Sequence, residues 1–99
     1  MYFDNEGVLK DEYGGKILTF NGEFTDKGVL TINSDNTKIT GRNTLFNNTV
    51  FNIKADGVML TNLKFVLNES FKNNANAGIY VTGDNVTAYN IDMTYDTPG

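Results

Sequence analysis

The chain has 99 residues, 12 of them acidic and 8 basic, so its net charge is −4. An acidic chain without a basic patch argues against a nucleic-acid partner, and the absence of cysteine and histidine excludes a disulfide framework, a thiol nucleophile and the commonest transition-metal ligands. No apolar run reaches the roughly 18 residues that a transmembrane helix needs.

The chain divides into a polar beginning and a longer part rich in short strands. Residues 1–16 are predicted to be a polar lead-in or part of an N-terminal cap, and residues 17–99 to form the rungs of a repeat array. The first predicted strand, Ile17–Phe20, ends at the turn dipeptide Asn21-Gly22. A second short segment, Glu23–Thr25, is expected to pair before the chain turns again.

A ten-residue phrase then occurs three times, starting at residues 32, 53 and 81. Its aspartates, Asp35, Asp56 and Asp84, are separated by 21 and then by 28 residues. The next residue is Asn, Gly and Asn in turn, and these types accept a positive φ. A period in this range predicts stacked units, each too small to bury its own apolar face.

Within each unit, apolar residues alternate on both sides of the turn, which is typical of strands with one inward face. Stacking would align Ile32, Ile53 and Val81 in one column and Ile39, Leu60 and Ala88 in another. A second corner is expected at Gly41, Asn62 and Asn90. After this corner the first unit is less regular, and we expect a one-residue insertion that turns Leu45 or Phe46 inward.

Three short strands and two tight corners in about 21 residues are typical of a right-handed parallel β-helix. The predicted fold is therefore an all-β solenoid of about three to four rungs, cut from a longer array. Residues 68–76 are polar and account for the longer second spacing as a loop insertion. A leucine-rich repeat and a flat β-sandwich stay as alternatives, although the leucine frame is sparse and the return path is β-branched.

Two segments carry a resemblance to a known family: TLFNNTVFNIKADGVMLTNLKF (residues 44–65) and GIYVTGDNVTAYNIDM (residues 78–93). They resemble the right-handed β-helix repeats of adhesin-like surface proteins from methanogenic archaea. The resemblance implies a non-catalytic structural or adhesive segment of an exported, extracellular cell-surface protein. It also implies loops displayed to a glycan or a cell-surface protein, with neighbouring rungs of the parent chain as the nearest contacts.

Candidate binding residues come from the columns and from the loop. Carboxylates stacked at Asp35, Asp56 and Asp84 offer the oxygen ligands that Ca²⁺ prefers, whereas the simpler interpretation is that each aspartate caps its turn. No other cofactor is expected. Tyr80 alternates with inward residues, so its ring should face outward as a platform for a sugar. In the loop, Asn68 and Asn73 are the expected binding residues.

The alternative function is a carbohydrate-active β-helix enzyme: a polysaccharide lyase, a hydrolase or an epimerase. Such chemistry needs clustered carboxylates. Beyond the aspartate column the chain offers Glu69, Asp92 and Asp96, which are not clustered in the sequence. The sequence therefore does not decide whether the protein is an enzyme, although it favours a non-catalytic protein. An uncapped last strand also predicts end-to-end association.

Overall fold

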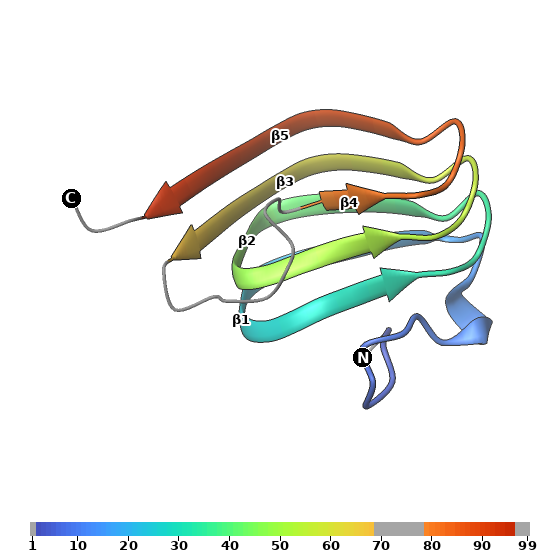
Figure 1. Cartoon of the computed structure of the whole chain (residues 1–99), viewed down its shortest axis with the longest axis horizontal. Coiled ribbons are helices and arrows are strands. Elements are labelled where there is room, and N and C mark those ends of the chain that lie inside the picture. Colours follow the sequence, from blue (N-terminus) through green and yellow to red (C-terminus); the bar gives the residue numbers. More distant parts are fainter. Residues whose placement is uncertain (1, 69–78, 97–99) are drawn as a thin grey trace.

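The computed structural model of the chain describes residues 2–68 and 79–96, and these residues form an all-β structure with a parallel sheet (Figure 1). The strands are β1 (Ile17–Ile32), β2 (Lys38–Ile53), β3 (Met59–Asn68), β4 (Ile79–Val81) and β5 (Thr87–Asp96). A single turn of 3-10 helix, η1 (Asp11–Tyr13), precedes β1.

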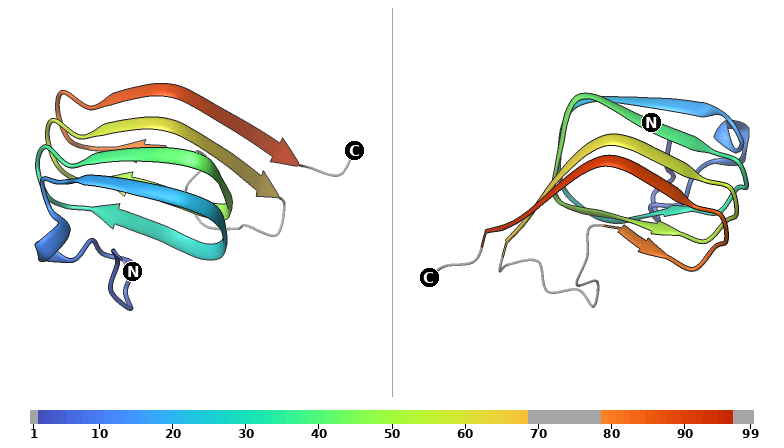
Figure 2. Two further views of the ribbon diagram at one scale, coloured as in Figure 1. Left: turned by 180° about the vertical axis from the view of Figure 1, so that it is seen from behind. Right: turned by 90° about the horizontal axis from the view of Figure 1, so that it is seen from above.

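The strands follow one another around a coil. β1 pairs with β2, whereas β2 pairs with β3 through Lys38–Thr40 and again at Phe46 and Asn47, and with β4 through Phe51–Ile53. Strands β3 and β4 therefore belong to one turn of the coil, and β5 lies on β3 in the next. Figure 2 shows the strands stacked in layers that wrap around a common interior. This arrangement is compatible with a β-solenoid, and one turn of the coil is called a rung below.

The columns predicted from the repeat are confirmed. Ile32 pairs with Ile53 and Ile53 pairs with Val81, all in parallel register. After the turn, Ile39 pairs with Leu60 and Leu60 with Ala88. Residues 21 positions apart, or 28 apart where residues 69–78 intervene, thus lie on top of one another, which a flat β-sandwich does not produce.

The pairing of β1 with β2 also shows one turn of the coil that lies before the first copy of the ten-residue phrase. Leu18 pairs with Ile39, so β1 begins the second column one rung earlier. The turn before β1 contains Gly14-Gly15, and Gly15 has a φ of +73°. Glycine here supplies the left-handed conformation that Asn36 supplies 21 residues later, where φ is +61°. The aspartate is missing, and the sequence pattern therefore concealed this turn.

The predicted end of the first strand is wrong. β1 does not end at Asn21-Gly22 but continues to Ile32. Its register against β2 shifts between Asn21 and Gly22, where Gly22 has a φ of +88°, and shifts again between Thr25 and Gly28. Such bulges bend a strand without ending its hydrogen-bonded pairing. The expected turns are therefore corners within one long strand.

The irregularity after the corner of β2 is larger than predicted. Thr40 pairs with Thr61 and Phe46 with Phe65, so five residues of β2 face three of β3 between these pairs. The expected insertion of one residue is therefore wrong, and two residues are inserted. Because the two strands differ by an even number of residues, their side chains are in phase again beyond the corner. Phe46 and Phe65 therefore both point inward and are completely buried, which confirms the expected inward turn for Phe46 rather than Leu45.

Aromatic side chains fill the interior of the coil. The largest fully buried side chains are Phe20, Phe46, Phe51 and Phe65. The rings of Phe46 and Phe65 stack with centroids 5.2 Å apart, and Phe51 meets Phe46 edge-on, also at 5.2 Å. Phe46 contacts the ring of Phe51 on its own rung and the rings of Phe20 and Phe65 on the neighbouring rungs, so burial of one rung depends on the rungs beside it.

The second corner uses left-handed asparagine and one closely packed glycine. Asn62 and Asn90 have φ values of +58° and +57°. Gly41 does not have a positive φ, and Asn43 occupies the left-handed position of its rung with φ +51°. A Cβ on Gly41 would lie 2.2 Å from the carbonyl oxygen of Asn62, so glycine is required there by the close approach of the next rung.

The two ends of the coil differ. At the N-terminal end, Phe3 and Leu9 are buried against the core, and Val8 forms a parallel bridge to Thr31. At the other end, Val81 is 43% exposed although Ile32 and Ile53, in the same column, are completely buried. Residues 2–13 therefore cover one end of the interior, whereas no described residue lies over β4 and β5 on their far side.

Truncation of the ring at the centre of the core should be costly. Phe46→Ala is expected to lower the free energy of unfolding by about 3–5 kcal/mol, because the neighbouring rungs cannot collapse into the cavity. Urea denaturation followed by circular dichroism measures this change. The matched control is Tyr89→Ala, which truncates a ring that is 70% exposed and should change stability by less than about 0.5 kcal/mol. Equal losses in the two variants would contradict the assigned core.

Candidate functional site

The three predicted aspartates are brought together at the turn, where they connect successive rungs. The backbone N–H of Asp56 donates to Oδ1 of Asp35 at 2.8 Å, and the N–H of Asp84 donates to Oδ1 of Asp56 at 2.8 Å. Main-chain bonds run beside them, since the N–H of Asn36 donates to the carbonyl of Asp56 at 2.9 Å. The carboxylates of Asp35 and Asp56 thus each cap the turn of the following rung rather than their own.

This arrangement gives the aspartates a structural role. Among the described residues, no group of three or more acidic, histidine or cysteine side chains is placed to hold a metal ion. Asp35 and Asp56 each use one carboxylate oxygen to accept a backbone N–H. Calcium binding by this column stays a prediction from the sequence, without support from an observed contact.

A second polar column runs along the corner of Asn43, Asn62 and Asn90. The amide Nδ2 of Asn90 donates to Oδ1 of Asn62 at 2.7 Å, so the side chains of adjacent rungs bond directly. Stacked asparagines make this ladder possible because the amide is both a donor and an acceptor. A shallow hollow of about 240 Å³ lies beside the column, and Lys64 and Asp92 are among its lining residues.

The predicted binding residues are scattered. Tyr80 lies on β4 and is 57% exposed, which confirms its outward orientation. Asn68 is the last residue of β3 rather than part of a loop, because its backbone continues the pairing with β5 at Asp96. Asn73 lies outside the described residues. None of the described acidic or aromatic residues is brought beside Tyr80 by a contact that would make a site.

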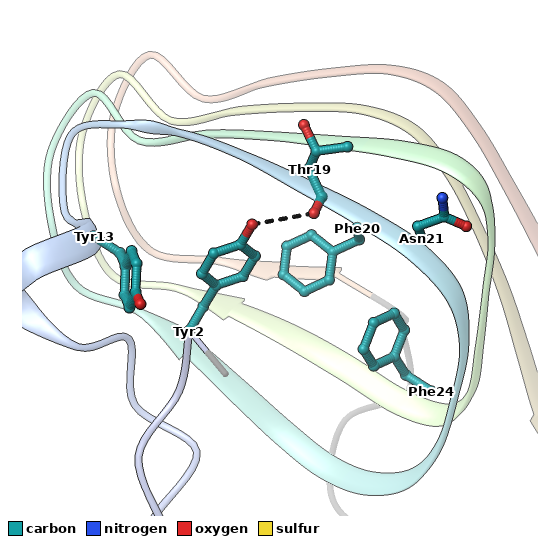
Figure 3. Close-up of a pocket in the computed structure, with 6 residues that line it drawn as sticks. All are labelled: Tyr2, Tyr13, Thr19, Phe20, Asn21 and Phe24. Carbon is teal, nitrogen blue, oxygen red and sulfur yellow. Dashed lines mark hydrogen bonds between the residues drawn. The ribbon is translucent and has the colours of Figure 1, made fainter.

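A pocket of about 310 Å³ lies at the N-terminal end of the coil, and we call it the aromatic pocket. It is lined by Tyr2, Tyr13, Thr19, Phe20, Asn21 and Phe24. Figure 3 shows the four rings lying across the end of the coil, with Thr19 and Asn21 on the strand that carries Phe20. Residues from the polar lead-in and from β1 therefore combine to form it.

Ring packing fixes the walls of the aromatic pocket. Tyr2 meets Tyr13 edge-on at 5.0 Å and Phe20 at 5.3 Å, and Phe20 meets Phe24 at 5.5 Å. The hydroxyl of Tyr2 donates to the carbonyl of Thr19 at 3.3 Å. Phe20 is buried, whereas Tyr13 and Phe24 are half-buried and keep part of each ring accessible.

Sequence reasoning missed the aromatic pocket for an identifiable reason. Tyr2 and Tyr13 belong to a segment whose acidic residues and glycines suggested a polar lead-in. The contacts of Tyr2 with Tyr13 and with Phe20 join residues that share no repeat period. The available signal was the concentration of aromatic residues in the first 24 positions, five in all: Tyr2, Phe3, Tyr13, Phe20 and Phe24.

Comparison of the chain with protein-family models, with curated proteins and with solved structures found no match. A search of the described residues for a helix long and apolar enough to cross a membrane also found none.

Removal of one capping carboxylate should weaken the turn that it bonds. Asp56→Ala is expected to lower the free energy of unfolding by about 0.5–1.5 kcal/mol, because the N–H of Asp84 loses its acceptor. Asp56→Asn keeps an oxygen at that position and should cost less. Urea denaturation distinguishes the two variants. If alanine and asparagine were equally harmless, the interaction between rungs would have no energetic role.

Proposed function

We propose that the chain is a non-catalytic segment of a right-handed parallel β-helix of about three to four rungs, part of a longer array in an exported cell-surface protein. Its function is structural and adhesive: a stiff support that displays side chains and loops to a glycan or to a protein on another surface. The resemblance of the repeat to adhesin-like surface proteins first suggested this function, and the contacts between rungs support it.

The observation that carries the proposal is the repeated bonding between rungs. Carboxylates at one corner and amides at the other join consecutive rungs at 2.8 Å and 2.7 Å, in addition to the backbone pairing. A support that must transmit force needs side chains that fix the strand register. Without such side chains, one parallel strand can slip along its neighbour. The polar columns therefore suit a load-bearing array.

The uncovered end supports a longer array. Asp35 and Asp56 each accept an N–H from the next rung, whereas the carboxylate of Asp84 accepts none from a described residue. Val81 and Ala88 continue two inward columns, yet both are exposed. One more rung would bury both side chains and would supply the donor for Asp84.

The placement of the carboxylates also favours a structural function over an enzymatic one. Glycoside-cleaving sites need two carboxyl groups that face each other across a substrate. Here the closest aspartates face backbone N–H groups of the neighbouring rung, and Asp92 lies on β5 at the opposite corner from that column.

Extension of the chain should stabilise it. Thr94 occupies the position of Val66 in β3 and of Asn47 in β2, so a second copy of residues 48–68 placed after Thr94 continues the register. The urea midpoint and the slope of the transition should both rise, since each rung adds buried surface. The control carries the same residues in scrambled order. A copied rung that stabilises no more than the scrambled one would contradict the array.

Adhesion is tested separately from architecture. Beads coated with the folded chain should be retained on a glycan array or on cells, and beads coated with the heat-unfolded chain should not, because displayed side chains depend on the register. Retention counted under flow measures the difference. Uniform absence of retention across glycans and cells would rule out the adhesive role.

A further inference from the structure

Ring contacts and a hydrogen bond hold the walls of the aromatic pocket in place. Tyr2 is held by its hydrogen bond to the Thr19 carbonyl at 3.3 Å and by edge-on contacts with Tyr13 and Phe20. Walls that are already fixed lose little conformational freedom on binding. A volume of about 310 Å³ exceeds the voids of a well-packed interior and lies at the lower end of the range for small-molecule sites.

The lining of the pocket selects for an uncharged ligand. None of its six lining residues carries a carboxylate, an ammonium or a guanidinium group. A charged ligand would lose hydration without gaining a partner of opposite charge. The half-buried rings of Tyr13 and Phe24 instead offer aromatic surface, which favours contact with C–H groups.

The edge of β1 adds hydrogen-bonding groups to this apolar wall. The N–H of Lys38 donates to the Lys16 carbonyl at 2.9 Å, so the backbone groups of Lys16 face β2. Successive residues of a strand present these groups to alternate sides, and Thr19 and Asn21 therefore face the N-terminal end. The bond from the Tyr2 hydroxyl to Thr19 agrees with this orientation. Both residues also line the pocket.

We propose that the aromatic pocket binds one ring of a neutral pyranose sugar, packed against the aromatic rings that line it and hydrogen-bonded to the edge of β1. A pyranose combines an apolar C–H face with hydroxyl groups around its rim, which matches aromatic rings beside backbone donors and acceptors. The volume accommodates a single ring rather than a long chain segment. The inference names the ligand of the proposed adhesive function and rests on that function only for the source of the glycan.

The test is a titration of the folded 99-residue chain with methyl glycosides of glucose, galactose, mannose and N-acetylglucosamine, followed by ligand-observed NMR and calorimetry. At least one neutral glycoside should bind, and glucuronate should bind more weakly. Tyr13→Ala should weaken binding by about five-fold or more, because one of the aromatic rings that line the pocket is lost. Tyr13→Phe keeps that ring and should retain affinity to within about two-fold.

Controls separate binding from folding. Tyr89→Ala removes an exposed ring on β5 and should leave the affinity unchanged. Circular dichroism confirms that each variant is folded, and if Tyr13→Ala unfolds, Phe24→Leu replaces it. The proposal is overturned if the folded chain binds none of the glycosides. It is also overturned if the neutral dye N-phenyl-1-naphthylamine binds in a Tyr13-dependent manner while the sugars do not, because the pocket would then accept purely apolar ligands.

This experiment can fail independently of the proposed function. Absence of sugar binding, together with stabilisation by the copied rung, would reject the pyranose site and leave the array intact. Sugar binding without stabilisation by the copied rung would retain the site and reject the array.

Discussion

Backbone pairing between residues about 21 positions apart is the constraint on which the structure depends. It places strands about 4.8 Å apart along the coil, so that a paired side chain lies above its counterpart in the previous rung. Each paired side chain must therefore pack against, or bond to, the one above it. Branched and aromatic residues satisfy this condition inside the coil, where Ile32 and Ile53 are completely buried.

At the corners, stacking turns small polar residues into bonded columns. Asn62 and Asn90 adopt the left-handed conformation, which costs asparagine less than most residues, and their amides then lie within hydrogen-bonding distance at 2.7 Å. The aspartate column achieves the same result with a carboxylate and a backbone N–H. The abundance of asparagine after residue 30 thus has a conformational cause and a bonding cause at these positions.

The two ends of the coil determine how the chain can interact. At one end, Phe3 and Leu9 from the segment before the repeat cover the interior. Tyr2 and Tyr13 of the same segment line the aromatic pocket at the edge of β1. At the other end, Val81 stays exposed in a column that is otherwise buried. The covered end therefore suits a small ligand, and the uncovered end suits a further rung.

The sequence by itself determined the parallel stacking, because an alternating apolar pattern and a turn that tolerates positive φ recur at one period. It therefore predicted the partners of Ile53 and Leu60 correctly. Only the tertiary structure decided the two-residue insertion before Phe46, since bulges absorb extra residues without a period of their own. Only the tertiary structure also decided the aromatic pocket, because the contacts of Tyr13 with Tyr2 and of Tyr2 with β1 join residues that no repeat relates.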